Sequence, residues 1–214
     1  MRHHCKDTLD WREALPRLPS HHQAEVVDLV AAYGAPRYCH VYLDDGRFDP
    51  LRKTDRVGEV GMVIRRPDGN LIVARKTFYP PNVFRLLTGG IGPDESISAA
   101  LAREVAEETS LTVRINRFLN IITYQSNVEI PYYFVSYVFL LDELAGTLQA
   151  SDPNEQVDEF RTIPPAELVK LAQQLRQLSD TSDPAIRGKW ASWGRFRAVM
   201  HEECAVWMND GVIG

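Results

Sequence analysis

The chain has 214 residues, of which 44% are hydrophobic and 25% are charged, and its formal net charge is −5. This length and composition are typical of one globular domain, with room for an appendage. The acidic balance argues against a protein that binds nucleic acid stably, although metal ions could still neutralise an anionic ligand locally. No apolar run approaches about 18 residues and the N-terminus lacks a signal-peptide core, so we expect a cytoplasmic protein without membrane spans.

The three cysteines, Cys5, Cys39 and Cys204, are odd in number and widely scattered along the chain. None of them belongs to a C-x-x-C pair. We therefore expect free thiols in a reducing compartment.

Residues 1–55 look like an extension that precedes a core of residues 56–214. Within it we expect a short helix over 9–18 that prolines break, a helix from an N-cap at Ser20 to Tyr33, and a strand over 38–43. The apolar face of the second helix would comprise Val26, Val27, Leu29, Val30 and Tyr33. The histidines His3, His4, His21 and His22 have no fixed partner spacing and adjacent pairs cannot easily share one ion, so we interpret them as surface residues.

The core begins with strands over 58–65 and 71–75, which the turn Pro67–Asn70 joins as a hairpin. Residues 76–87 are expected to form a loop because Pro80 and Pro81 interrupt regular structure. Further along, we expect strands over 113–124, 132–141 and 159–163, and helices over 166–178 and 190–208. The apolar content of the two long strands predicts a sheet that is covered on both faces.

Between these strands lies the segment from Gly89 to Leu111, with the sequence GGIGPDESISAALAREVAEETSL. We interpret Gly89–Pro93 as a glycine-rich turn outside regular structure, followed by a helix that starts near Pro93. On this helix Glu104, Glu107 and Glu108 fall within an arc of roughly 100°. Because three carboxylates so close together repel one another, a cation between them would stabilise the arrangement. A solvated acidic helix face is the alternative interpretation.

The spacing G-x5-E-x7-R-E-x-x-E-E-x-x-L, from Gly89 to Leu111, resembles the Nudix box, the signature of the Nudix hydrolases. One position departs from the family pattern, since Ser110 stands where the family usually has glycine. That glycine ends the helix in a left-handed conformation, so serine should cost about 1 kcal/mol or less there. The resemblance implies an α/β fold, namely an α/β/α sandwich with a mixed β-sheet, here with the N-terminal extension and C-terminal helices added.

The resemblance also implies hydrolysis of a diphosphate bond in a nucleoside diphosphate linked to another group, with Mg²⁺ or Mn²⁺ as cofactor. Hard oxygen ligands suit these ions. By resemblance, Glu104, Glu107 and Glu108 hold the metal, helped by a backbone carbonyl near Gly90, and we single out Glu107 and Glu108 above all. Arg103 would pair with Glu95 or with a ligand carboxylate and hold it in place.

Some family members take the general base or a further metal ligand from a loop after the box. The candidates here are Asp152, Glu155, Asp158 and Glu159, of which we select Glu155; an ordinary acidic surface loop is the alternative. Arg85 or Arg75 could bind a substrate phosphate bidentately, or either could be a surface charge. The aromatic residues that could stack on a base, although such residues are more often core, are Phe78, Tyr79, Phe84, Tyr124 and Tyr132.

The substrate is less defined, because the markers of several Nudix subfamilies are missing. The position of the proline that marks ADP-ribose hydrolases holds Asn127. A sugar-linked or other nucleoside diphosphate is favoured, with nucleoside triphosphates next. N-terminal additions build dimer interfaces in several subfamilies, so the resemblance suggests a homodimer. A nucleotide sensor that binds without cleavage is the alternative from another functional class.

Overall fold

The computed structural model describes residues 10–43, 56–126, 134–209 and 211. A mixed β-sheet lies at the centre, with strands in the order β1-β5-β6-β2-β3-β7 and with β4 paired to β2 outside this path. Its strands are β1 (Arg37–Leu43), β2 (Gly58–Arg65), β3 (Leu71–Lys76), β4 (Leu87–Ile91), β5 (Leu111–Ser126), β6 (Phe134–Gly146) and β7 (Val157–Ile163). The pairs β1–β5 and β2–β6 are parallel and the other pairs are antiparallel.

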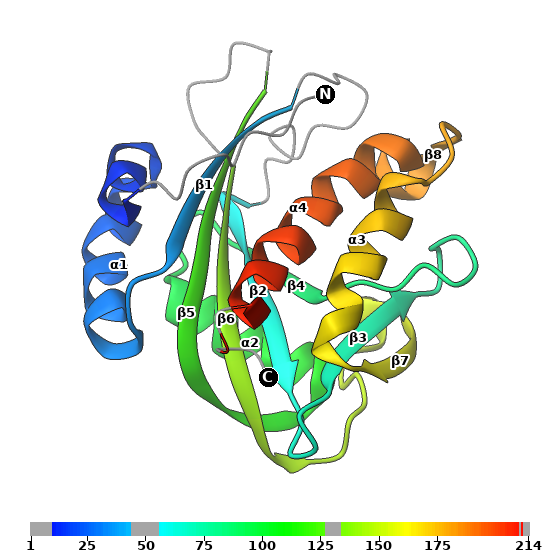
Figure 1. Cartoon of the computed structure of the whole chain (residues 1–214), viewed down its shortest axis with the longest axis horizontal. Coiled ribbons are helices and arrows are strands. Elements are labelled where there is room, and N and C mark those ends of the chain that lie inside the picture. Colours follow the sequence, from blue (N-terminus) through cyan, green and yellow to red (C-terminus); the bar gives the residue numbers. More distant parts are fainter. Residues whose placement is uncertain (1–9, 44–55, 127–133, 210, 212–214) are drawn as a thin grey trace.

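Helices cover both faces of this sheet, as Figure 1 shows. The 3₁₀ helix η1 (Trp11–Arg17), α1 (Ser20–Tyr33) and α2 (Ile97–Thr109) pack on one face, and α3 (Leu168–Arg176) and α4 (Trp190–Asn209) pack on the other. Short elements complete the chain: η3 (Pro153–Glu155), η4 (Pro165–Glu167), β8 (Ser182–Asp183), η5 (Pro184–Ile186) and β9 (Gly188–Lys189). The expected α/β/α sandwich with a mixed sheet is therefore confirmed.

The two faces of the sheet follow from the alternation of side chains along each strand. On β2, Val60, Met62 and Ile64 are buried under α1 and α2, while Val63 is buried under α3 and α4. Gly61 also faces α4, and a Cβ there would lie 2.8 Å from the sulfur of Met200. The predicted core of the last helix is confirmed, because Trp193, Phe196, Val199, Met200 and Trp207 are all buried.

The glycine-rich segment before the box helix is not the turn that the sequence predicts. Leu87–Ile91 forms β4, whose residues Gly89 and Gly90 pair with Val60 and Glu59 of β2. Glycine is unfavourable in a strand interior for lack of a packing side chain, which is why the pattern was misleading. Here the missing side chains leave room for neighbours, since a Cβ on Gly89 would lie 1.9 Å from Cδ of Glu104.

The box helix also starts later than predicted, at Ile97 and not near Pro93. Ser96 is its N-cap and its hydroxyl accepts a hydrogen bond from the backbone N–H of Ala99 at 3.2 Å. A serine N-cap satisfies one of the N–H groups left free at a helix start, which decides the boundary. At the other end Ser110 takes the left-handed conformation, with φ 56° and ψ 18°, so the departure from the usual glycine is absorbed without a change in helix ending.

Several expectations for the N-terminal extension need correction. Residues 11–17 form a 3₁₀ helix that contains Pro16, and the N-cap of α1 is Pro19, with Ser20 as the first helical residue. Val27 is 48% exposed and does not belong to the apolar face. His22, expected at the surface, is fully buried. The extension nevertheless contains the predicted helix and strand, and β1 joins the central sheet beside β5.

The cysteine expectation is also partly wrong, since Cys39 is disulfide-bonded, whereas Cys204 is a buried free thiol. Cys5, His3, His4, Asn127 and Tyr132 lie outside the described residues. None of the helices that the structure describes combines the length and apolar character needed to cross a bilayer.

Candidate active site

Three carboxylates meet near Gly89, the middle residue of β4. Glu104 and Glu108 come from successive turns of α2, and Glu155 comes from η3; one oxygen from each lies within 4.8 Å of the others. Glu104 and Glu108 are only 6% and 2% exposed. A group of oxygens at this spacing, mostly out of water, is a donor set for a hard divalent cation.

Two features of the structure place these three carboxylates. The i, i+4 spacing on α2 puts Glu104 and Glu108 on one side of the helix, and the absence of a side chain at Gly89 gives the Glu104 carboxylate its space. The segment before η3 is fixed to the end of α2, because the Ser151 backbone N–H donates to the Glu107 carbonyl at 2.9 Å and the Gln149 N–H to the Thr109 carbonyl at 3.0 Å. This docking brings Glu155 to Glu108.

The pKa values in this cluster reflect burial and nearby cations, of which Lys76 contacts two of the carboxylates. Burial raises the pKa of Glu108 to about 7, although Lys76 and Arg85 act in the opposite direction. Burial also raises the pKa of Glu104, against the effect of Arg103. For Glu155 burial acts upward as well, but the hydrogen bond and charge of Lys76 outweigh it and lower the pKa. Without a bound metal ion, burial therefore makes the ionised forms of Glu104 and Glu108 unfavourable.

The cation that contacts Glu108 and Glu155 is Lys76, the last residue of β3, which the sequence interpretation placed in a loop and gave no function. Its Nζ lies 2.8 Å from Glu155 Oε2 and 3.1 Å from Glu108 Oε1. The first contact is a hydrogen bond; the second is an ion pair only, and Glu108 Oε1 is a buried oxygen without a hydrogen bond to any residue that the structure describes. Glu108 thus retains acceptor capacity directed into the cluster.

Arg103 organises the outer side of the same helix. It donates from Nε and Nη2 to the two oxygens of Glu95 at 2.8 and 2.9 Å, which confirms the expected pairing. It also donates to Glu104 Oε1 at 2.8 Å, to Glu107 Oε2 at 3.0 Å and to the Gly90 carbonyl at 2.8 Å. These hydrogen bonds to Arg103 lower the pKa of Glu95 and fix several acceptors in one geometry.

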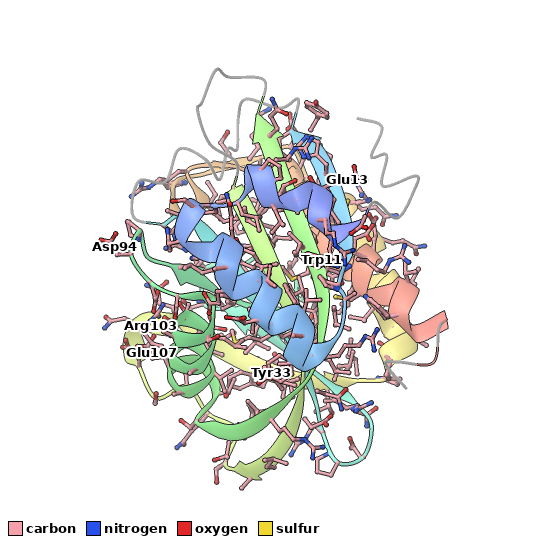
Figure 2. The ribbon with its side chains drawn as sticks, turned by 90° about the vertical axis from the view of Figure 1, so that its left-hand side faces the viewer. Trp11, Glu13, Tyr33, Asp94, Arg103 and Glu107 are labelled. Carbon is pink, nitrogen blue, oxygen red and sulfur yellow. The ribbon has the colours of Figure 1, made fainter. Side chains whose placement is uncertain are left out.

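The same contacts bear on two expected metal ligands. Glu107 is paired with Arg103 on the outer side of α2 and does not belong to the group of three carboxylates found among the described residues. Figure 2 shows Arg103 and Glu107 adjacent at the edge of the molecule. The Gly90 carbonyl accepts from Arg103, which leaves one lone pair for another partner. Ligation by Glu107 and Gly90 stays a prediction.

Arg85 carries a positive charge into the interior with only neutral partners. It is 5% exposed and donates to the Tyr79 hydroxyl at 2.6 Å, the Leu86 carbonyl at 2.7 Å and the Thr88 hydroxyl at 2.9 Å. None of the described carboxylates forms a salt bridge with it. These bonds use Nε and Nη1, so Nη2 is the part of the guanidinium that remains for a ligand. Glu108 and Glu59 are near enough for their charges to act on the pKa of Arg85, but neither forms an ion pair with it, so this buried guanidinium favours the binding of an anion.

A pocket of about 580 Å³ connects these groups. Gly89, Gly90, Glu104, Lys76 and Arg85 line it on the side of α2 and β4, and Trp193 and Arg197 of α4 line it on the other side. The full set of charged lining residues is Arg56, Lys76, Arg85, Glu104, Glu155, Arg187 and Arg197. Cations exceed carboxylates in this wall although the whole chain is acidic, so the pocket is suited to an anionic ligand.

Other residues singled out from the sequence lie elsewhere. Arg75 pairs with Asp158 and Glu159, which holds these three side chains in ion pairs beside β7. Asp152 accepts the Asn154 backbone N–H at 2.8 Å and so holds the start of η3. Of the aromatic candidates, Phe78 and Tyr79 line the pocket, whereas Phe84 and Tyr124 are buried in the core.

Lys76 was missed although strand alternation carries a signal for it. On β3, Ile72 and Ala74 face α2, while Leu71 and Val73 face α3 and α4. By the same alternation Lys76 faces α2 and Arg75 faces away. For Arg56, Arg187 and Arg197 no comparable pattern exists, because their approach to the pocket depends on how distant segments pack.

The NUDIX domain model matches residues 55–184 of this chain. An ADP-ribose pyrophosphatase of Methanocaldococcus jannaschii is 29% identical over 99 residues, which is 46% of this chain and 57% of that protein. The chain thus spans little more than half of the length of this curated relative.

Two solved structures show low similarity. An Ap4A hydrolase binary complex of C. elegans is 15% identical, with a TM-score of 0.45 over 72% of this chain and 98% of that one. A MutT protein of Methanosarcina mazei Go1 is also 15% identical, with a TM-score of 0.44 over 74% of this chain and 97% of that one.

Proposed function

The chain belongs to the Nudix family, and we propose that it hydrolyses a diphosphate bond in a nucleoside diphosphate linked to another group. The observation that carries this proposal is the meeting of Glu104, Glu108 and Glu155, because Glu104 and Glu155 line a cation-rich pocket and Glu108 lies directly beside them. The carboxylates would hold a divalent cation, and the arginines would bind the charged phosphates. Both functions are required for diphosphate hydrolysis at neutral pH.

The residues present fit Mg²⁺ or Mn²⁺. All three ligand atoms are carboxylate oxygens, and Glu108 Oε1 is buried without a hydrogen bond among the described residues. The space that Glu104 occupies exists only because Gly89 has no side chain. When bound, the cation would offset the charge of the diphosphate and make water more acidic.

The protein side chains have separate functions in this proposal. Glu104 and Glu108 bind the cation, with Glu107 and the Gly90 carbonyl as further predicted ligands. Glu155 is the predicted general base or a further ligand of the cation, because it lies beside Glu104 and Glu108 on the segment after the box and Lys76 lowers its pKa, which keeps it ionised. Arg103 holds Glu95, Glu104 and Glu107 in place, and Arg85 presents Nη2 to a substrate phosphate.

ADP-ribose or a sugar nucleotide is the substrate that we propose first. It is supported by the name of the similar protein from Methanocaldococcus jannaschii, an ADP-ribose pyrophosphatase. Nucleoside triphosphates are next. Action in the cytoplasm and assembly into a homodimer through the N-terminal extension remain predictions; sedimentation analysis of the purified chain tests the dimer.

The test is a panel of nucleotides with Mg²⁺, Mn²⁺ or EDTA, including ADP-ribose, sugar nucleotides, dinucleoside polyphosphates and nucleoside triphosphates. Products are separated by chromatography, and Glu108→Gln serves as the inactive variant. We expect metal-dependent release of a nucleoside monophosphate that this variant loses. Tight, metal-independent binding of one compound without turnover would instead indicate a nucleotide sensor.

A further inference from the structure

We infer that helix α1 of the N-terminal extension positions the box helix α2, and that Glu25 and His22 are the residues that do so. This inference rests on the proposed function, since it concerns how the metal-binding carboxylates are held. Both residues lie outside residues 55–184, the part that the NUDIX domain model matches. They are therefore an addition of this chain to the matched domain.

Glu25 binds the start of α2 through both carboxylate oxygens. Oε2 accepts the backbone N–H of Ile97 at 2.8 Å, and Oε1 accepts the backbone N–H and the hydroxyl of Ser98 at 2.8 and 2.7 Å. These N–H groups have no partner within the helix. The first turn of α2 contains no acidic residue of its own, so α1 supplies the negative charge that stabilises a helix N-terminus.

His22 fixes Glu95, the residue that precedes the N-cap of α2. Its Nε2 lies 3.0 Å from the backbone carbonyl of Glu95, and its Nδ1 lies 3.1 Å from the Tyr137 hydroxyl. Because a carbonyl can only accept, we assign the proton to Nε2, and Nδ1 then accepts from Tyr137. The ring is fully buried, and burial lowers its pKa, which agrees with this neutral form.

From Glu95 the contacts continue to the carboxylate cluster without a break. The Glu95 side chain accepts the backbone N–H of Gly92 at 3.0 Å and is bound by Arg103, which also binds Glu104 and Glu107. A displacement of α1 would thus shift both the start of α2 and the residue that orders its acidic side chains. In Figure 2, α1 crosses the same sheet face on which α2 lies, with Asp94 in the connection that enters α2.

The experiment compares Mn²⁺ binding to the full chain and to Glu25→Ala, with free Mn²⁺ followed by electron paramagnetic resonance. Asp28→Ala is the matched control, since it removes an exposed acidic residue from the same helix. Thermal melts define a temperature at which every variant is folded. We expect Glu25→Ala to bind Mn²⁺ about tenfold more weakly than wild type, because losses of this size follow the mutation of residues that orient metal ligands. Asp28→Ala should bind Mn²⁺ as wild type does. The kcat should fall in parallel.

Glu25→Gln covers the case in which Glu25→Ala does not fold, because the amide keeps the size of the side chain and one acceptor oxygen. It should also bind Mn²⁺ more weakly than wild type. Unchanged Mn²⁺ affinity in the folded Glu25 variants, with only a lower melting temperature, would show a purely structural contact and overturn the inference. Wild-type protein that binds no Mn²⁺ would instead overturn the proposed function itself, and this inference with it.

Discussion

Lys76 places its ammonium nitrogen 2.8 Å from Glu155 Oε2, between this carboxylate and Glu108. Burial acts to lower the pKa of Lys76, but the charges of the two carboxylates outweigh it and raise the pKa. In the metal-free protein Lys76 is therefore the cation that keeps two acidic groups together. A bound metal ion would use the same two carboxylates, Glu155 and Glu108, as ligands.

Replacing Lys76 by methionine should lower the thermal stability of the metal-free protein and increase its affinity for metal ions. The buried Glu108 and the partly buried Glu155 would lose the lysine that pairs with them, which destabilises the fold until a metal ion binds. We expect a lower melting temperature without metal, a larger rise on addition of Mn²⁺, and several-fold tighter Mn²⁺ binding. Lys170→Met, which removes an exposed lysine from α3, should behave as wild type. Equal responses of the two variants would contradict this assignment.

Gly89→Ala should reduce metal affinity while the protein still folds. The new Cβ would overlap Cγ and Cδ of Glu104, which lie at the mobile end of a side chain, so Glu104 can turn away while the backbone stays in place. We expect a folded protein, by circular dichroism and thermal melting, that has lost most Mn²⁺ affinity. Gly69→Ala is the reciprocal control, because φ is +85° in that hairpin and alanine is strained there. It should melt at a lower temperature but bind Mn²⁺ normally.

Ser110→Gly should stabilise the protein. Ser110 adopts a left-handed backbone conformation, which costs a non-glycine residue energy that glycine does not lose. After allowance for the greater freedom of glycine in the unfolded chain, we expect the free energy of unfolding to rise by about 0.5 kcal/mol. Urea unfolding measures this change, and Ser110→Ala, which keeps the strain, should show no gain. A less stable Ser110→Gly would mean that the serine hydroxyl contributes more than the backbone strain.

His201 should make stability fall as the solution becomes acidic. Its Nδ1 faces the Arg197 carbonyl and its Nε2 accepts the Leu86 N–H at 3.0 Å, so protonation would remove an acceptor in a fully buried site. Burial lowers the pKa of His201 to about 4, from 6.5. The unfolded chain therefore takes up the proton first, and stability is lost as pH falls from 6.5 toward 4.

The comparison variant is His201→Gln, whose amide oxygen can accept the same N–H. Relative to this variant, wild type should lose on the order of 2 kcal/mol over that pH range. Chemical unfolding at a series of pH values measures the difference. A constant difference across the range would contradict the role of His201 in acid sensitivity.

Local sequence patterns predict most elements well because they depend on neighbouring residues. The strand over 58–65 agrees with β2 at both ends, and α4 starts at Trp190 as expected. Selecting Glu155 from four acidic residues also agrees with its place in the cluster, whereas Asp158 is bound to Arg75. Its function as a base is still a prediction.

What the patterns miss depends on contacts between distant segments. β4 contains two glycines and is a strand only because β2 pairs with it and Glu104 fills the space above Gly89. Adjacent histidines give no hint that His22 is buried, since its partners Glu95 and Tyr137 are far away in the chain. Both cases need the tertiary structure, because no local propensity encodes them.

The pairing of β1 with β5 has a consequence for the order in which the chain folds. In this parallel pair Arg37 lies opposite Asn120 and Leu43 lies opposite Ser126. During synthesis from the N-terminus, β1 must therefore wait, without its hydrogen-bonding partner, until the box helix and β5 have left the ribosome. Such long-range pairing slows folding. We expect the N-terminal segment to join the sheet only after β5 is available, closing the edge of the sheet and fixing the box helix in the same step.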